Sequence, residues 1–304
     1  MKNLHDFVTV RPHTWWTFEL FTNKENKMNY VPRGFTVRMG MWLVLTIAVV
    51  PALAETPITS CPFNITASGN YILNADLTCV GAGITITASN VSLKLNGHRI
   101  TVPSSAQSIK AITVDGNSVG RVHHVGIQGP GLIASPSQSA IIVGIYLRSA
   151  DYSQVSQVTI VGLFTIDGGF SVWDCNFLTL TSNVVGRSGN GIAMYDTNSS
   201  SVTGNDTSGN VTGISLFRGS GNTVNNNIAN GNSFVGIWAD SGARVSGNVT
   251  NGNGQHGIVG SSAISQIFNN SSKANGLFDL FEPGGCTGSW SDNVFFTANA
   301  PCIR

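Results

Sequence analysis

Charged side chains are scarce in this chain. Aspartate, glutamate, lysine and arginine make up 10% of its 304 residues, and the formal net charge is +1. Without a surplus of either sign, neither a nucleic-acid partner nor a strongly acidic ligand is indicated. Helical periodicity is missing as well, since no 11-residue window in the repetitive second half has a helical apolar stripe. The polar surface must therefore come from asparagine, serine and threonine, and the fold from strands.

Cysteine is also sparse, with five residues in the whole chain. Cys61 and Cys79 bracket the start of the expected mature protein, and Cys286 and Cys302 bracket its end. Two local disulfides are the economical pairing and fit an exported protein. Cys175 is left over, and we expect it to be a small buried apolar side chain.

A long apolar run occurs at Met41–Ala54, after Arg33 and Arg38, and it ends in the small-x-small pattern of a signal-peptidase site. It is too short for a comfortable membrane span of about 20 residues. We therefore interpret residues 1–54 as an overextended start, with a later methionine as initiator, plus a cleaved export signal. An uncleaved anchor is the alternative. The expected location is secreted, periplasmic or on the cell surface, with no membrane contact after cleavage.

A repeat of about 22 residues dominates the second half of the sequence. A glycine followed by an apolar residue opens each repeat, and a weaker member begins at Gly144. The clear members are Gly169-Phe170, Gly191-Ile192, Gly213-Ile214, Gly236-Ile237 and Gly257-Ile258. Short alternating runs between them are typical of strands, so the period predicts coils of three short strands stacked on one another.

Two rows of asparagine follow the same period. The first is Asn183, Asn205, Asn227, Asn248 and Asn270, and five positions later come Ser188, Asn210, Asn232, Asn253 and Asn275. We expect each row to form a ladder along the stack, with left-handed asparagines whose amides hydrogen-bond from coil to coil. The many Asn-x-Ser/Thr triplets have the same origin and need not be glycosylation sites.

The stretches "ITASGNYILNADLTC" and "GITITASNVSLKLNGHRI" carry a resemblance. They are similar to the opening segment of right-handed parallel β-helix proteins of the NosD-like and pectate-lyase-like superfamily. The matching residues are Gly69, Tyr71, Leu73, Leu95, Asn96, Gly97 and His98. The similarity covers about Ile65 to Leu280 and is specific for fold, not for activity. Where relatives often have aspartate this chain has Lys94, so no role of that acid is carried over.

The resemblance implies an exported protein that binds or processes polysaccharide, alongside relatives without known activity. The copper association of NosD-type proteins does not transfer, because copper requires clustered histidine and methionine ligands. The mature chain has only His98, His123, His124 and His256, which are not spaced as a set. We expect no metal and no cofactor. His123 and His124 should point to opposite faces of a strand.

An outward row of aromatic and charged side chains accompanies the repeat. Counted from each repeat glycine, positions plus one and plus three are apolar, which places position plus four outside. Positions plus four and five are Trp173-Asp174, Tyr195-Asp196 and Phe217-Arg218, and the next coil adds Trp238 and Asp240 slightly out of register. Such rings could bind sugar rings while the charged groups bind hydroxyls. The alternative is that a loop, a cap or a second subunit covers them.

Asp174 and Asp196 are the candidate catalytic pair. Glycoside hydrolysis needs two carboxyl groups about 5 to 10 Å apart, and backbones one coil apart are separated by about 4.8 Å. No supporting motif is present, since the sequence lacks the catalytic stretches of polygalacturonases, alginate epimerases and pectate lyases. Whether the protein is a polysaccharide hydrolase or lyase stays open.

The sequence therefore predicts an all-β protein, a right-handed parallel β-helix of about nine coils at residues 81–280. Disulfide-pinned caps at 55–80 and 281–304 should cover its ends, and Trp290, Phe295 and Phe296 should plug the last coil. The expected function is polysaccharide binding, with processing left open, along the aromatic and acidic row. The rival hypothesis is a non-catalytic structural or surface protein that uses the row as a protein interface; the oligomeric state is not predicted.

Overall fold

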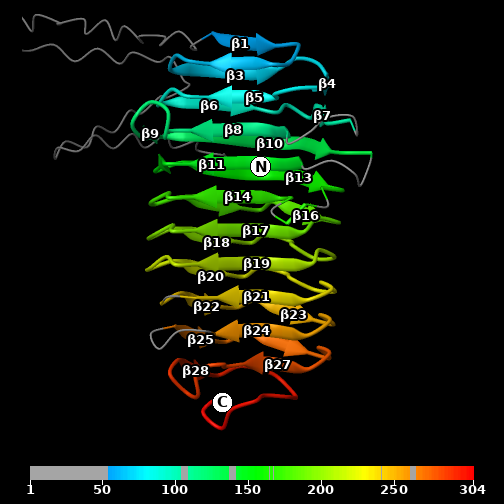
Figure 1. The fold of residues 1–304 in the computed structure, drawn as a ribbon, viewed down its shortest axis with the longest axis vertical. Helices are drawn as coiled ribbons and strands as arrows, with labels where there is room; N and C mark the ends of the chain where they lie inside the picture. The colour runs from blue at the N-terminus through cyan, green and yellow to red at the C-terminus, as the bar shows by residue number, and fades with distance from the viewer. Residues whose placement is uncertain are drawn as a thin grey trace, which may run out of the picture. The chain divides into compact units, whose positions relative to one another are not determined.

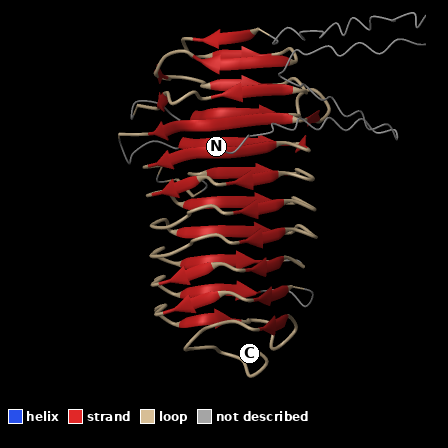
Figure 2. Cartoon of the chain, turned by 180° about the vertical axis from the view of Figure 1, so that it is seen from behind, coloured by secondary structure: helices blue, strands red, loops and turns tan. Residues whose placement is uncertain are grey.

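The computed structural model describes residues 54–103, 109–136, 142–163, 165–166, 168–240, 242–260 and 265–304. Within these ranges the chain forms strands and turns, and none of it is a helix that could cross a membrane. The coils stack in sequence order from β1 (Glu55–Ile58) to β28 (Ser289–Ser291) (Figures 1 and 2). The expected export signal lies, except for Ala54, outside the described residues.

One continuous parallel sheet has ten strands and carries the aromatic row. Its order is β2 (Phe63–Ile65), β5 (Ile84–Ile86), β8 (Ile109–Asp115), β11 (Ile142–Arg148), β14 (Phe170–Trp173), β17 (Asn190–Tyr195), β19 (Thr212–Phe217), β21 (Val235–Ala239), β24 (His256–Gly260) and β27 (Phe278–Phe281). Nine of these strands, β5 to β27, belong to the predicted coils, so the expected number is confirmed. We call this the ten-stranded sheet.

A second parallel sheet of fourteen strands forms another side. From β1 it continues through β3 (Gly69–Leu73), β6 (Val91–Lys94), β10 (Val125–Ala134), β13 (Gln154–Val161), β15 (Thr179–Thr181), β18 (Ser201–Thr203), β20 (Thr223–Asn225), β22 (Arg244–Ser246) and β25 (Gln266–Phe268) to β28. Three further strands of this sheet lie beside that path: β4 (Leu77–Thr78) pairs with β7 (Arg99–Thr101), β7 also pairs with β10, and β16 (Val184–Gly186) pairs with β13.

The third side of the stack is made of short strands and single bridges. Its paired strands are β23 (Val249–Asn251) and β26 (Ser271–Lys273). The short pair β9 (Val122–His123) and β12 (Ala150–Asp151) lies instead at the turn from the ten-stranded to the fourteen-stranded sheet. Isolated parallel bridges join Val184, Asp206, Ile228 and Val249 from coil to coil. The protein is thus a right-handed parallel β-helix, as the sequence predicts.

The core is a column of apolar side chains inside the coils. Positions plus one and plus three after each repeat glycine point inward, as expected, and Phe170, Val172, Ile192 and Met194 are buried. The glycine itself is required by close approach: a Cβ on Gly191 would run into the carbonyl oxygen of Gly213, one coil away. This crowding explains why each repeat opens with glycine.

The asparagine ladders form with the predicted hydrogen bonds. In the first ladder, the backbone N–H and the side-chain Nδ2 of Asn205 both donate to Oδ1 of Asn227, at 2.8 and 3.0 Å. Asn227 Nδ2 also donates to the carbonyl of Val202 at 2.9 Å. These asparagines are fully buried, so the amide saturates backbone groups that water cannot reach.

The left-handed conformation predicted for these asparagines is wrong. It belongs to the residue immediately before each one, where φ is 54° at Ser182, 65° at Gly204, 53° at Asn226 and 67° at Gly247. The preceding residue makes the sharp turn, and this directs the asparagine side chain inward to the next coil. The second ladder follows the same rule, with Gly209 before Asn210.

Both predicted disulfides, Cys61–Cys79 and Cys286–Cys302, are present, and Cys175 is free and buried. Residues 55–80 form β1 to β4, which extend both sheets. Lys94 forms an ion pair with Glu55 at 2.6 Å, which gives this lysine a role in joining the first coils.

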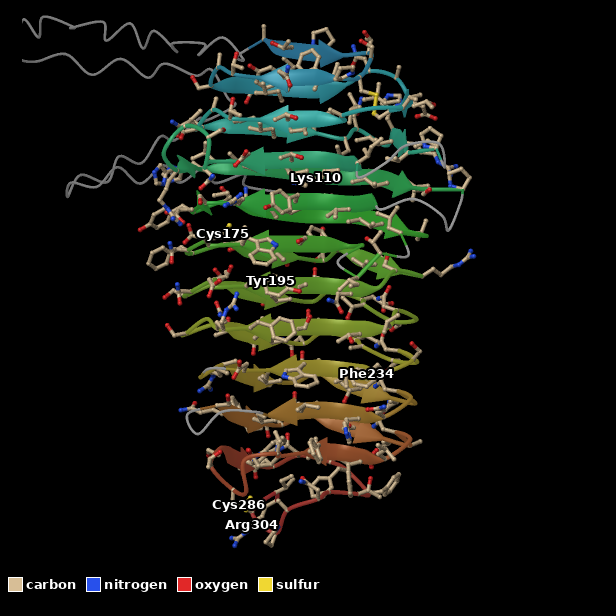
Figure 3. The ribbon with its side chains drawn as sticks, in the orientation of Figure 1. Lys110, Cys175, Tyr195, Phe234, Cys286 and Arg304 are labelled. Carbon is tan, nitrogen blue, oxygen red and sulfur yellow. A yellow bond between two sulfur atoms is a disulfide. The ribbon has the colours of Figure 1, made fainter. Side chains whose placement is uncertain are left out.

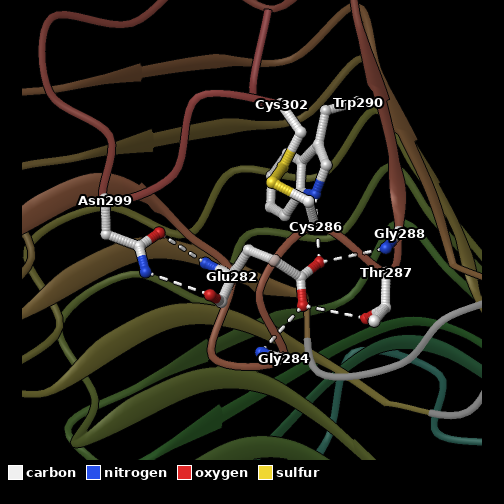
Figure 4. Close-up of a disulfide and its surroundings, with 8 residues drawn as sticks. All are labelled: Glu282, Gly284, Cys286, Thr287, Gly288, Trp290, Asn299 and Cys302. Atoms are coloured by element: carbon white, nitrogen blue, oxygen red, sulfur yellow. Dashed lines mark hydrogen bonds between the residues drawn. A yellow bond between two sulfur atoms is a disulfide. The ribbon is translucent and has the colours of Figure 1, made fainter.

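The C-terminal cap is organised around a buried carboxylate (Figure 4). Glu282 accepts hydrogen bonds from the N–H groups of Gly284 and Gly288, from the Thr287 hydroxyl and from Trp290 Nε1, at 3.1 to 3.3 Å. Trp290 packs against the core as predicted. Phe295 is partly buried there, whereas Phe296 is 75% exposed and does not plug the last coil.

Candidate functional site

The predicted aromatic row lies on the outer face of the ten-stranded sheet. Trp173 ends β14, Tyr195 ends β17 and Phe217 ends β19, and they are register partners. Each is half-buried. Trp238 in β21 pairs in register with Ser215 rather than Phe217, which confirms the expected offset. We call these four residues the aromatic column; Figure 3 shows Tyr195 with Lys110 on the same face of the stack.

The rings of the aromatic column stack on one another. The centroids of Trp173 and Tyr195 are 4.1 Å apart and the planes differ by 17°; those of Tyr195 and Phe217 are 5.1 Å apart at 16°. Near-parallel rings this close must overlap, because carbon atoms need about 3.5 Å between them. Part of each ring face is therefore covered by the neighbouring ring, which sequence alternation alone did not indicate.

The column opens toward its C-terminal end. Phe217 and Trp238 are 6.4 Å apart with planes tilted by 40°, and Phe234 lies 6.5 Å from Trp238. The planes of Phe234 and Trp238 are within 19° of parallel, but both centroid separations are larger than those between Trp173, Tyr195 and Phe217. A flat ligand therefore has more access at this end than between Trp173 and Tyr195.

Toward the N-terminus, polar groups take the place of the rings. Arg148 is the register partner of Trp173, and Asp115 is the partner of Arg148. The ammonium group of Lys110 lies 3.5 Å from the ring centroid of Tyr146, a cation–π contact. Burial lowers the pKa of Lys110 from its ordinary value. The aromatic column is thus bounded by a charged, hydrogen-bonding region.

Asp196 is held by an arginine one coil away. Arg218 donates from Nε to Oδ1 at 3.1 Å and from Nη2 to Oδ2 at 3.0 Å, so each carboxylate oxygen accepts one hydrogen bond from it. Both side chains are exposed, and the pair contributes little net stability. Its hydrogen bonds raise the pKa of Arg218 above its ordinary value.

Asp174 belongs to a second ion cluster that joins three coils. Arg121 donates from Nε and Nη2 to the two oxygens of Asp151 at 2.7 Å, and from Nη1 to Asp174 Oδ2 at 2.8 Å. The Ser149 hydroxyl donates to Asp174 at 2.9 Å. Burial disfavours ionisation of Asp151, but hydrogen bonds from Arg121 and Asn176 outweigh it and hold the pKa of this carboxyl below its ordinary value.

The two candidate catalytic aspartates therefore have separate arginine partners. Asp174 binds Arg121 and Asp196 binds Arg218. A general acid in glycoside hydrolysis is kept protonated by its surroundings, usually by an apolar pocket. Neither aspartate lies in such a pocket, because both side chains are exposed. The geometry places both aspartates beside the aromatic column and is better suited to hydrogen bonding than to proton transfer.

Sequence reasoning missed a second row of rings, at the turn after the ten-stranded sheet. The rings of His124, Tyr152 and Phe177 stack in consecutive coils, with centroids 5.6 and 4.7 Å apart and planes 16° and 10° from parallel. We call these three residues the turn ridge. The steps between them are 28 and 25 residues, not 22, so counting the period did not find them.

Cys175 lies beneath the turn between the two aromatic rows. Its thiol donates to the carbonyl of Trp173 at 3.3 Å and accepts from the N–H of Ala150 at 3.4 Å. Burial raises its pKa to about 12. Because the thiolate is the reactive form, this cysteine is chemically inert in the folded protein.

Solved structures similar to the chain share its fold. The enzymatically active domain of tailspike protein 2 from bacteriophage CBA120 has a TM-score of 0.54 at 13% identity, covering 77% of this chain and 42% of that one. GH136 lacto-N-biosidase from Eubacterium ramulus has a TM-score of 0.51 at 12% identity, covering 75% of this chain and 48% of that one. DFA-IIIase from Arthrobacter chlorophenolicus A6 has a TM-score of 0.50 at 17% identity, covering 76% of this chain and 66% of that one. At these identities the likeness shows the fold alone. This chain spans less than half of the first two.

No curated protein sequence matches the chain significantly. Residues 64–296, however, match the sequence profile of a family described as periplasmic copper-binding protein (NosD). Copper sites need clustered histidine, methionine or cysteine ligands. In the described part of the chain, no three His, Cys, Asp or Glu residues are grouped so that they could hold a metal.

The environments of the individual side chains agree with that result. His98 contacts Asp76 at 3.1 Å, His256 packs on Phe278 and Phe281, and Met194 is buried in the core. The described residues thus do not fit a copper ion. The family match itself extends over well more than half of the sequence. Through that match, the chain belongs to the NosD family.

Proposed function

We propose that this protein binds polysaccharide outside the cytoplasm, along the aromatic column. The observation that carries the proposal is the coil-by-coil alignment of Trp173, Tyr195 and Phe217 on an accessible sheet face. With Trp238 the column spans three steps, roughly 14 Å at about 4.8 Å per coil. Ring edges and open faces supply the apolar surface that the C–H groups of sugar rings require.

Polar groups beside the column are suited to bind the hydroxyl groups of a sugar. Asp196 and Arg218 pair next to Tyr195 and Phe217, and both side chains are exposed. Their remaining hydrogen-bonding capacity is available to hydroxyl groups. The row of rings and the neighbouring ion pair lie side by side along the axis of the stack, which supports an extended saccharide over a compact ligand.

Binding without catalysis is the version that the geometry favours. Each candidate catalytic aspartate is held by its own arginine, Arg121 or Arg218. We therefore propose that Asp174 and Asp196 orient hydroxyl groups. An Asp196→Asn variant that keeps binding but loses release of reducing sugar would restore the enzymatic version.

Export is supported by two features of the chain. Its family is described as periplasmic, and it has two disulfides, which persist in oxidising compartments. The ligand would therefore be a polysaccharide of the envelope or of the surroundings.

The test is affinity electrophoresis of the full chain in gels that contain plant, algal or bacterial polysaccharides. The Tyr195→Ser/Phe217→Ser variant should lose retardation, because it lacks two rings of the aromatic column. It should still fold, because Arg148 and Asp115 occupy the same position in neighbouring coils. Phe268→Ser, a half-buried aromatic on the fourteen-stranded sheet, is the matched control. Absence of retardation by every polysaccharide, with an intact fold, would overturn the proposal.

Sedimentation separates this proposal from the protein-interface hypothesis. A stable oligomer of the wild-type chain that dissociates in Tyr195→Ser/Phe217→Ser would assign the column to a protein contact. We expect the sedimentation coefficient of that variant to equal that of the wild type.

A further inference from the structure

Six consecutive coils share one left-handed turn position. Backbone N–H groups connect it from coil to coil, and φ lies between 50° and 66° in every coil. The residues are Asn90, His124, Tyr152, Phe177, Ser199 and Gly221. Asparagine, serine and glycine are the usual occupants of such a turn. The three aromatic members are the turn ridge.

Aromatic residues are costly in this conformation. Non-glycine residues rarely adopt positive φ, and bulky ones are outliers there. The chain shows at Ser199 and Gly221 that small residues satisfy the same turn. Three successive bulky rings therefore do not serve the turn itself. Local strain of this kind is characteristic of functional positions.

The turn ridge is the more exposed of the two aromatic rows. Tyr152 is 52% exposed and Phe177 is 49% exposed, whereas the members of the aromatic column are half-buried. Trp173 and Phe177 lie at the two ends of one short turn, in which Asp174 is the second residue. The two rows therefore border one surface, and the Arg121 ion cluster lies between them.

The charge of this surface selects against anions. Arg121 is bound by two carboxylates, Asp151 and Asp174, which leaves one excess negative charge. Arg218 is likewise bound, by Asp196. Lys110 and Arg148 at the N-terminal end of the column add two cations, beside Asp115. The four cations of this surface are thus matched in number by Asp115, Asp151, Asp174 and Asp196, whereas a polyanion needs uncompensated cations. A neutral polysaccharide meets no such penalty.

The size of the turn ridge argues against a protein partner. A large aromatic residue buries 150 to 250 Å² when covered, so three half-exposed rings offer roughly 300 Å². A stable protein interface requires about 800 Å² on each partner. A narrow row of rings flanked by carboxylates is instead suited to a saccharide chain.

From these observations we infer that the turn ridge is a second subsite for polysaccharide and that the ligand is a neutral glycan, which passes from the aromatic column over the Arg121 cluster. The inference rests on the proposed function and extends it by a subsite and a ligand class. A ligand that crosses the turn follows only from the two rows together, because they border one surface.

The experiment compares three variants of the full chain by affinity electrophoresis. The ridge variant is Tyr152→Ser/Phe177→Ser, which places at each position the residue type that Ser199 supplies at the same turn. The column variant is Tyr195→Ser/Phe217→Ser, and the control is Phe296→Ser, an exposed aromatic of the C-terminal cap. The neutral probes are hydroxyethyl cellulose, galactomannan and dextran, and the anionic probes are alginate and polygalacturonate. Failure of Cys175 to react with a thiol reagent reports an intact turn in each variant.

We expect a neutral probe to retard the wild type and the control, with little effect of salt. An aromatic contact is worth 0.5 to 1.5 kcal/mol, so each ring removed should weaken binding about twofold to tenfold. The ridge variant lacks two rings and should therefore lose about fourfold to hundredfold in affinity. Neither anionic probe should retard the wild type.

The outcomes separate the two proposals. Wild-type affinity in the ridge variant, with loss in the column variant, overturns the second subsite and keeps the proposed function. Loss in the ridge variant alone keeps the turn ridge and overturns the role of the aromatic column. Retardation by anionic probes only overturns the neutral ligand class. A wild-type oligomer that dissociates in the ridge variant assigns the ridge to a protein interface instead.

Discussion

At the scale of single residues, the stack depends on buried amides at fixed positions. Each ladder asparagine lies after a left-handed residue and hydrogen-bonds both to the next asparagine and to a backbone carbonyl of the preceding coil. No water reaches these groups, so each amide is the partner that its neighbours need. Substitution should therefore cost more than the loss of one exposed hydrogen bond.

Asn227→Ala tests this directly. The change leaves the backbone N–H and Nδ2 of Asn205 and the carbonyl of Val202 without their present partner. An unpaired buried group costs about 1–3 kcal/mol, so we expect a loss of about 3 kcal/mol or more in the free energy of unfolding by urea. Asn64→Ala, on an exposed strand position, is the control. Equal losses in both variants would contradict the ladder as a source of stability.

His256 makes stability depend on pH. It packs on Phe278 and Phe281, and burial lowers its pKa below the ordinary 6.5. Between the folded and unfolded pKa values the unfolded chain binds more protons, so stability must rise with pH through that window and level off above about 6.5. Urea midpoints should therefore fall from pH 7 to pH 5.

His256→Phe should remove that pH dependence. The folded-state pKa values of Asp151 and Asp279 lie below the ordinary 3.8, so their contributions are lost only at lower pH and do not interfere. A urea midpoint that rises on acidification of the wild type would contradict the lowered pKa of His256. An unchanged slope in His256→Phe would assign the effect to another group.

At the scale of elements, the C-terminal cap is a unit held by one carboxylate. Glu282 gathers four donors from residues 284–290, and Asn299 Nδ2 donates to its carbonyl at 3.0 Å. The Cys286–Cys302 disulfide closes the same segment. These contacts place Trp290 over the last coil and cover its apolar end, which a solenoid requires.

Glu282→Gln should loosen this cap. The amide nitrogen replaces an oxygen that accepts from two donors, so about 2–4 kcal/mol should be lost. Amide exchange should accelerate in residues 283–302 and stay unchanged in β14 to β19. Asp292→Asn makes the same charge change at an exposed position and is expected to be neutral. The role of Glu282 is refuted if both variants behave alike.

At the scale of the whole molecule, the described coils contact mainly their neighbours in the stack. Both sheets follow the order of the sequence, and each strand pairs with the strand one coil away. Stability in such an array is a sum of local terms and nearest-neighbour terms. A change at one end should therefore have little influence at the other.

Removal of the N-terminal disulfide measures how far a disturbance spreads. Cys61→Ser/Cys79→Ser opens a loop worth about 3 kcal/mol in the chain-entropy model. We expect faster hydrogen exchange in β1 to β4 and unchanged exchange from β14 onward. Uniformly faster exchange along all coils would mean that the stack unfolds as a single cooperative unit.

The sequence by itself determined the period, and with it the fold. Glycine, asparagine and inward apolar residues recur every 22 residues because stacked coils impose the same contacts at the same place in each turn. Trp173, Tyr195 and Phe217 could be aligned for that reason, and the paired cysteines at the two ends fixed the disulfides. The period also indicated that the stacked strands are parallel, and the family resemblance added the right-handed sense of the coil.

Only the tertiary structure decided what the aligned residues contact. Arg121 reaches Asp151 and Asp174 across separations of 30 and 53 residues, and the turn ridge is spaced by 28 and 25. Coils of irregular length break the count, so these neighbours cannot be read from the period. Ring overlap and the left-handed turns depend in the same way on coil-to-coil packing, because backbone closure and side-chain contact distances are properties of the folded stack.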